Sequence, residues 1–193
     1  MGNFSQSLQA LMLQGNKLVG HIPQTYPIGS VLRIVDLSEN NLQGELPRAL
    51  VNCRMLEFLD VGYNQINDSF PFWLSTLPEL KVISLRHNEF YGPIKCPKPC
   101  TFSKLHILDC SHNKFSGTLL PEMIKSWKSM MVSNARNIPQ QLTELTFLEF
   151  FNVSFNKLTG TTPAVSSLVN LLGVESALFE AKTHPRRTSL PSD

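Results

Sequence analysis

The sequence predicts an α/β repeat protein: a right-handed solenoid of about six repeats whose short parallel strands form a sheet on the concave face. One observation is the spacing of leucine-like residues, asparagine, glycine and proline in residues 32–47, LRIVDLSENNLQGELP, which returns along the chain. Another is that six asparagines follow one another at steps of 24, 24, 24, 25 and then 43 residues. Because one such unit cannot bury its own apolar side, stability must come from stacking neighbouring copies.

The hydrogen-bonding capacity of an amide explains why asparagine recurs at the turn of each repeat. In the second repeat, the side chains of Val35 and Leu37 are expected to point inward from a short strand. Asn40 follows where the chain turns out of that strand. An amide side chain both donates and accepts, so copies stacked at about 4.8 Å can satisfy the backbone groups of adjacent turns. We therefore expect a structural asparagine ladder at Asn16, Asn40, Asn64, Asn88, Asn113 and Asn156.

Repeats one to five occupy residues 1–124, and the periodic spacing then fails over residues 125–138, an irregular junction. A last repeat follows at 139–172, and residues 173–193 are expected to form a disordered tail. Behind the second strand, Leu50, Cys53 and Leu56 recur every third residue, which indicates a short 3₁₀ or helical segment on the back of the stack.

The four cysteines fall into two groups. Cys53 and Cys110 occupy apolar, inward positions of the repeat and are expected to be buried. Cys96 and Cys100 flank a proline-containing loop and are close enough in sequence to form a disulfide in an oxidising compartment.

Outward-facing residues of the strands are the candidates for ligand contact, because concave repeat surfaces bind extended partners across several repeats. The residue just before each turn asparagine should face outward, and aromatic, arginine and imidazole groups dominate interface energetics. The candidate ligand-binding residues on the concave face are Glu39, Tyr63, Arg86, His87 and His112.

Two other chemistries are considered and set aside. Asp36 and Asp60 should be neighbours on adjacent strands, like a catalytic carboxylate pair, but the repeat places them on a flat face without a cleft. A zinc-like set is present on paper, yet Cys110 must point inward while the histidines point outward. We therefore predict no catalytic residues, no enzyme activity, no metal and no cofactor. That zinc-like set comprises Cys96, Cys100, His106, Cys110 and His112.

Composition and targeting signals argue against nucleic acid as a partner and against a membrane span in this sequence. The 193 residues carry a net charge of +2 with 17% charged residues, so no nucleic-acid-binding footprint is expected. No run of about 18 apolar residues predicts a membrane span, and the first residues have no secretory-leader pattern. Three N-x-S sequons nevertheless predict glycosylation at Asn3, Asn67 and Asn152.

The repeat unit LxxLxLxxNxLxGxIP resembles the plant-type extracellular leucine-rich repeat, and residues 32–47 match it nearly throughout. Residues 52–74 and 85–94 resemble the C-terminal half of plant receptor-like proteins of the disease-resistance type. Residues 140–156 resemble the last repeat of that family. Between them, the family's non-repeat island and following repeats look deleted, with a join between about residues 132 and 137.

The resemblance implies a non-catalytic recognition module in defence or developmental signalling, which binds a peptide or protein ligand and a receptor-kinase co-receptor. The resemblance also implies a location on the extracellular face of the plasma membrane. If the chain were complete as written, it would lack a signal peptide and a membrane span, and its location would be cytosolic or unknown. Two alternatives stay open: a truncated or degenerate receptor product without signalling function, and a soluble repeat inhibitor of a secreted hydrolase.

Overall fold

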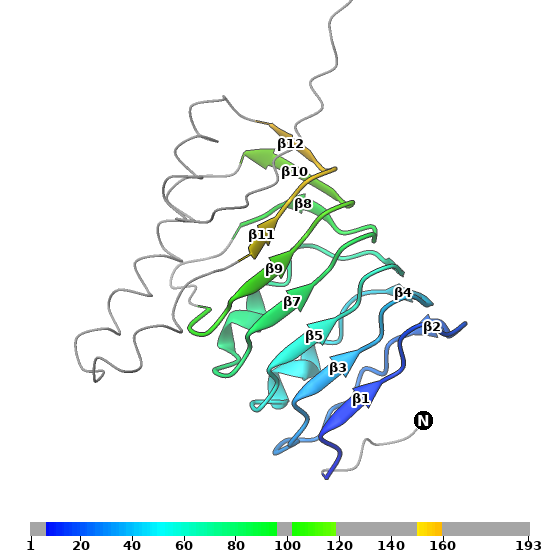
Figure 1. Cartoon of the computed structure of the whole chain (residues 1–193), viewed down its shortest axis with the longest axis vertical. Coiled ribbons are helices and arrows are strands. Elements are labelled where there is room, and N and C mark those ends of the chain that lie inside the picture. The colour runs from blue at the N-terminus through cyan, green and yellow to red at the C-terminus, as the bar shows by residue number, and fades with distance from the viewer. Residues whose placement is uncertain (1–6, 96–101, 119–149, 160–193) are drawn as a thin grey trace, which may run out of the picture.

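The computed structural model describes residues 7–95, 102–118 and 150–159. The expected junction at 125–138, the tail at 173–193, most of the last repeat, Asn3, Cys96 and Cys100 lie outside these residues. The described part is a stack of repeats that confirms the predicted solenoid (Figure 1).

The main sheet takes one short strand from each repeat. All pairings are parallel and in constant register, so that Val35 lies beside Leu59, Leu59 beside Ile83 and Ile83 beside Leu108. Each of these central residues is buried, because alternate residues of a strand face opposite sides. The strands, in spatial order, are β1 (Ala10–Met12), β3 (Ile34–Asp36), β5 (Phe58–Asp60), β7 (Val82–Ser84), β9 (Ile107–Asp109) and β11 (Phe150–Asn152).

A second set of strands follows the asparagine turns, and sequence reasoning did not predict it. These strands form two separate three-stranded parallel sheets, visible beyond the turns in Figure 1. One contains β2 (Val19–His21), β4 (Asn41–Gly44) and β6 (Gln65–Ile66), and the other contains β8 (Tyr91–Pro93), β10 (Lys114–Thr118) and β12 (Lys157–Thr159).

The two small sheets meet at Asp68, which stands where the neighbouring repeats have glycine. Its buried carboxylate accepts hydrogen bonds from the backbone N–H groups of Leu46 and Ser69, at 3.3 and 2.7 Å. Arg48 forms an ion pair with it at 3.1 Å and lies over the Trp73 ring at 5.0 Å. The carboxylate thus supplies acceptors for backbone donors near the break between the small sheets.

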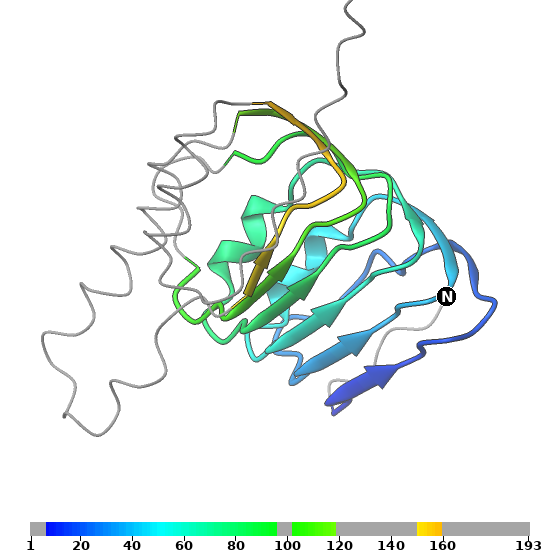
Figure 2. The same ribbon diagram turned by 45° about the horizontal axis from the view of Figure 1, so that its top comes forward.

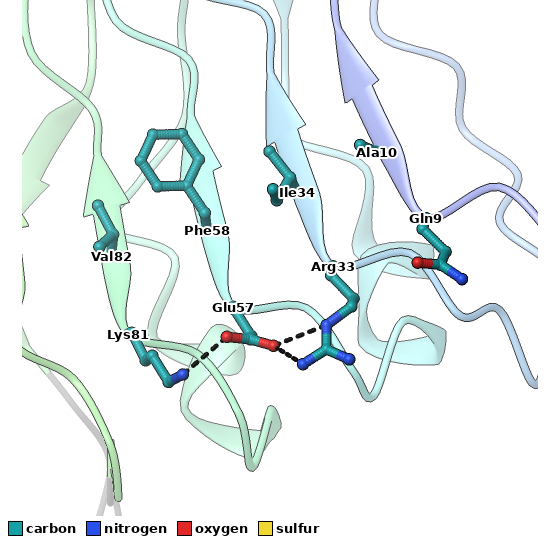
Figure 3. Close-up of a pocket in the computed structure, with 8 residues that line it drawn as sticks. All are labelled: Gln9, Ala10, Arg33, Ile34, Glu57, Phe58, Lys81 and Val82. Carbon is teal, nitrogen blue, oxygen red and sulfur yellow. Dashed lines mark hydrogen bonds and ion pairs between the residues drawn. The ribbon is translucent and has the colours of Figure 1, made fainter.

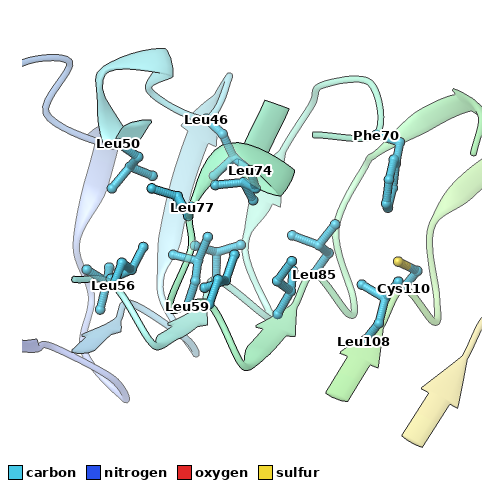
Figure 4. Packing of buried hydrophobic residues seen from close by; sticks show 14 of the residues in the cluster. Leu46, Leu50, Leu56, Leu59, Phe70, Leu74, Leu77, Leu85, Leu108 and Cys110 are labelled. Carbon is cyan, nitrogen blue, oxygen red and sulfur yellow. The ribbon is translucent and has the colours of Figure 1, made fainter. Parts of the chain in front are cut away.

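The back of the stack carries two 3₁₀ turns, η1 (Arg48–Asn52) and η2 (Phe72–Thr76), behind the main sheet in Figure 2. Leu50 and Leu74 point from these turns toward Leu56 and Leu59 (Figure 4). All four side chains are fully buried, and each contributes about 1.5–3 kcal/mol by leaving water. Cys53 and Cys110 are also buried as free thiols, as their inward positions predicted.

The turn asparagines bridge neighbouring repeats through the backbone. Asn64 Oδ1 accepts from the N–H of Leu42 at 2.9 Å, and Asn64 Nδ2 donates to the carbonyl of Leu37 at 2.9 Å, both in the preceding repeat. The same amide also donates to its own turn, to the carbonyl of Val61 at 3.1 Å. The same cross-repeat pattern occurs at Asn40, Asn88, Asn113 and Asn156.

Replacing a central asparagine should therefore lower stability. We expect Asn64→Leu to reduce the free energy of unfolding by about 1–3 kcal/mol, because the Leu42 N–H and Leu37 carbonyl lose their partners. Urea denaturation measures the change, and the exposed neighbour Gln65→Leu serves as the control. Equal midpoints for Asn64→Leu and the wild type would refute this role.

Candidate functional site

The outward surface of the main sheet forms the candidate site, and its side chains lie in four rows that cross the strands. In the order in which each strand reaches them, they are the charged row, the apolar row, the acidic row and the ring row. The charged row contains Arg33, Glu57 and Lys81, the apolar row contains Ala10, Ile34, Phe58, Val82 and Ile107, the acidic row contains Asp36, Asp60 and Asp109, and the ring row contains Tyr63, His87, His112 and Phe155. Tyr63, His87 and His112 of the ring row were predicted from the sequence as candidate contacts, and the apolar row was not predicted.

The apolar row does not belong to the repeat consensus, so the spacing of leucines and asparagines does not reveal it. Its members directly precede the buried residue at the centre of each strand, so two-residue alternation would have placed them on the outer face. Ile34 keeps 37% of its surface exposed, Ala10 is exposed as well, and the other members are half-buried. The described side chains of this row are Ala10, Ile34, Phe58, Val82 and Ile107.

A shallow hollow lies over the first strands, between the apolar row and the charged row (Figure 3). At its charged edge, Glu57 accepts from Arg33 Nε at 2.7 Å and from Lys81 Nζ at 2.7 Å. The hydrogen bond from Lys81, followed by that from Arg33, lowers the pKa of Glu57. The hollow thus has an apolar wall and a charged rim. Its lining residues are Gln9, Ala10, Arg33, Ile34, Glu57, Phe58, Lys81 and Val82.

The acidic row contains Asp36 and Asp60, which are register partners on adjacent strands as the sequence predicted. Their carboxylates are used locally: Asp36 Oδ1 accepts from Ser38 N–H at 3.1 Å, and Asp60 Oδ1 accepts from Gly62 N–H at 2.7 Å. Burial raises the pKa of Asp60, and repulsion from Asp36 adds to this rise. These carboxylates accept hydrogen bonds from the backbone of the turns that follow them, which supports a structural rather than a catalytic role for the pair.

The ring row is a continuous stack at the ends of the strands. Ring centroids lie 4.2 Å apart between Tyr63 and His87, 3.9 Å between His87 and His112, and 4.1 Å between His112 and Phe155. Each of these residues has a positive φ of 50–53°, a strained conformation that the neighbouring backbone stabilises. Exposed Glu39, at φ 56°, has the same place in the preceding repeat.

The surroundings of His87 disfavour the charged form of its imidazole. The pKa of His87 is lowered by burial first, then by repulsion from His112 and Arg86, while Asp109 acts in the opposite direction. His87 is therefore held closer to its neutral form than an exposed histidine.

Arg86 comes from the same turn as His87 and lies across the concave face. Its guanidinium carbon sits 4.8 Å from the centre of the Tyr63 ring. Its stem occupies space above Gly62, where a Cβ would lie 2.9 Å from Arg86 Cγ. The candidate residues Tyr63, Arg86, His87 and His112 are thus brought into one contiguous group.

Metal and thiol chemistry find little support in the described part of the chain. No group of three or more His, Cys, Asp or Glu side chains there could hold a metal ion. Cys110 is completely buried, and burial raises the pKa of its thiol well above the usual range. Within the described ranges, none of the helices has the length and apolarity needed to span a bilayer.

The two described sequons differ in accessibility. Asn67 and Ser69 are exposed beyond β6, and the Asn67 amide has a long contact of 3.4 Å to Glu89. Asn152 is half-buried in β11, and its Oδ1 accepts from Ser154 N–H at 3.0 Å.

Comparison with known proteins identifies the repeats. Models described as leucine-rich repeat match residues 6–66 and 104–127. Receptor-like protein 53 of Arabidopsis thaliana is 46% identical over 130 residues, which cover 67% of this chain and 13% of that protein. Receptor-like protein 43 of Arabidopsis thaliana is 45% identical over 130 residues, 67% of this chain and 18% of that protein. The chain therefore spans less than a fifth of the length of these two relatives.

Solved structures with the same fold include receptor ectodomains. The plant peptide hormone receptor RGFR1 in complex with RGF2 matches with a TM-score of 0.66 and 28% identity, over 84% of this chain and 23% of that one. The PEPR1–AtPEP1 structure matches with a TM-score of 0.60 and 30% identity, over 86% and 24%. HAESA of Arabidopsis, in complex with the peptide hormone IDA and the co-receptor SERK1, matches with a TM-score of 0.58 and 27% identity, over 78% and 26%.

The raised pKa of Asp60 gives a testable pH dependence. Folding favours its protonated form, so this residue's contribution is most favourable below the unfolded pKa of about 3.9 and is lost as pH rises through the folded pKa. Asp60→Asn should therefore raise the urea midpoint at about pH 7, with a smaller gain at about pH 3.5. Asn152 already makes the equivalent backbone contact with an amide. A gain that grows on acidification would contradict the assignment.

Proposed function

This chain belongs to the leucine-rich-repeat receptor-like proteins of plants, and from that premise we propose that its concave face binds an extended peptide ligand. The observation that carries the proposal is the apolar row, flanked by the charged row on one side and by the acidic and ring rows on the other. An extended peptide could bury apolar side chains against this row and set polar groups against its neighbours.

The geometry suits a peptide that crosses the strands. The five described apolar-row side chains span four strand spacings, or about 19 Å, which corresponds to about six extended residues. The hollow lined by this row lies on the outer face of the sheet, where an extended ligand can reach it.

The relatives support the same function and suggest its context. RGFR1 and HAESA were solved with peptide hormones, and HAESA also with the co-receptor SERK1. By analogy, we propose that this chain's repeats act at the cell surface, in defence or developmental signalling, together with a receptor-kinase partner. The contacts for the ligand would include Glu39, Tyr63, Arg86, His87 and His112, with the apolar row added.

Peptide binding can be tested without knowing the natural ligand. A pooled library of synthetic extended peptides is passed over the immobilised chain, and the retained peptides are quantified. We expect Phe58→Asp to weaken retention about 30-fold, because a carboxylate in the middle of the apolar row removes a hot-spot contact.

The matched control for that experiment is Val51→Asp, which places the same charge on the exposed back turn η1. It should leave peptide retention unchanged. Equal retention by Phe58→Asp and wild type, with unchanged unfolding midpoints, would rule out the apolar row as a peptide-binding surface.

Passage through a secretory pathway should leave a glycan on Asn67, because both Asn67 and Ser69 are exposed. Intact mass before and after glycosidase treatment measures it, and Asn67→Gln should abolish the shift assigned to this site. An Asn67 peptide of unmodified mass after secretion would argue against this site.

A further inference from the structure

Arg86 differs from the other cations of the concave face in its pairing. Arg33 and Lys81 are both engaged by Glu57. Arg86 forms no ion pair within the described residues, and its buried Nε has no hydrogen-bond partner there. A guanidinium has five N–H donors, so this half-buried side chain keeps donors that no described carboxylate uses.

The position of Arg86 is fixed by its neighbours rather than by a carboxylate. The Tyr63 ring contacts the guanidinium at 4.8 Å. The missing side chain at Gly62 makes room for the stem, because a Cβ there would approach Arg86 Cγ to 2.9 Å. Arg86 itself is the equivalent residue of the next repeat, and Ser38 and Ser111 are the equivalents in two others, so the backbone at this position accepts serine.

Two imidazoles extend the same polar group. His87 and His112 stack at 3.9 Å beside Arg86, and His112 Nδ1 has no partner among the described residues. The acidic groups facing them are Asp109 and Asp60. Asp60 Oδ1 already accepts from Gly62 N–H; burial raises the pKa of Asp60, while the charge of Arg86 lowers it.

We propose that Arg86, supported by the stacked imidazoles of His87 and His112, is a carboxylate-binding subsite for the peptide ligand. The inference rests on the proposed peptide binding and adds the chemical class of one ligand group. A carboxylate matches the planar guanidinium fork with two parallel hydrogen bonds, and the adjacent imidazoles offer further donors.

The subsite predicts a dependence on pH. His87 faces Tyr63, Arg86, His112 and Asp109, and its neutral form is favoured without ligand. A bound carboxylate adds negative charge beside His87 and favours its protonation. Carboxylate binding should therefore strengthen from about pH 7.5 to about pH 5.5, where an aspartate of the peptide stays ionised.

The experiment uses three pools of synthetic peptides on the full chain. Two pools have blocked ends and differ only in a fixed Asp or a fixed Asn, and the third has the fixed Asn with a free C-terminus. We expect the wild type to retain one carboxylate-bearing pool about tenfold better than the blocked Asn pool. The pool that is retained identifies a side chain or a chain terminus as the source.

Three variants test the residues. Arg86→Gln should abolish the carboxylate preference, and Gly62→Ser should reduce it by displacing Arg86 while removing no charged group. Lys114→Gln, which removes an equal charge from a residue paired with Glu89, should keep the preference. If Gly62→Ser shifts the unfolding midpoint, Arg86→Lys is used in its place. Lysine keeps the positive charge but lacks the planar guanidinium fork, so the carboxylate preference of Arg86→Lys should fall below that of the wild type.

The outcomes separate this inference from peptide recognition itself. Equal retention of all three pools by wild type would overturn the carboxylate subsite and leave peptide binding standing. Retention of none would overturn both proposals. A preference that survives Arg86→Gln would also overturn the subsite, and a preference that does not change with pH would remove the imidazoles from it.

Discussion

The hydrogen bonds between each turn asparagine and the preceding repeat are the constraint on which the structure depends. One amide satisfies backbone groups of two turns at once, as Asn64 does with Leu42, Leu37 and Val61. These bonds lie at the edge of the apolar stack, where unpaired backbone groups would be costly. They fix the distance and the rotation from one repeat to the next, so every other position of the repeat is also brought into register.

The constant register of the strands aligns equivalent residues of successive repeats into rows across the sheet. The residue before each asparagine adopts a positive φ, and from His87 to Phe155 this directs successive rings into one stack. The same register aligns the apolar row, which is separated from the ring row by the acidic row. A surface with the dimensions of an extended peptide thus follows from stacking alone, without any residue having been placed in a pocket.

Departures from the repeat give the face its individual features. Gly62 stands where three other repeats have Ser38, Ser111 and Ser154, and the space that it leaves is taken by the Arg86 stem. Asp68 replaces a glycine and brings Arg48 onto Trp73 at the back of the stack. Such positions are where an otherwise uniform scaffold acquires specificity, because a periodic position has the same surroundings in every repeat.

The sequence by itself determined the stack, the parallel strands, the buried positions of Cys53 and Cys110, and the pairing of Asp36 with Asp60. Spacing alone carries this information, because a repeat fixes which residues face inward and which become neighbours. The sequence named Tyr63, Arg86, His87 and His112 as outward residues. The tertiary structure decided that the rings stack, that Arg86 lies over Gly62 without an ion pair to any described carboxylate, and that the apolar row lines a hollow. Those features depend on side-chain volume and charge across neighbouring repeats, and residues about 24 positions apart meet only once the repeats are stacked.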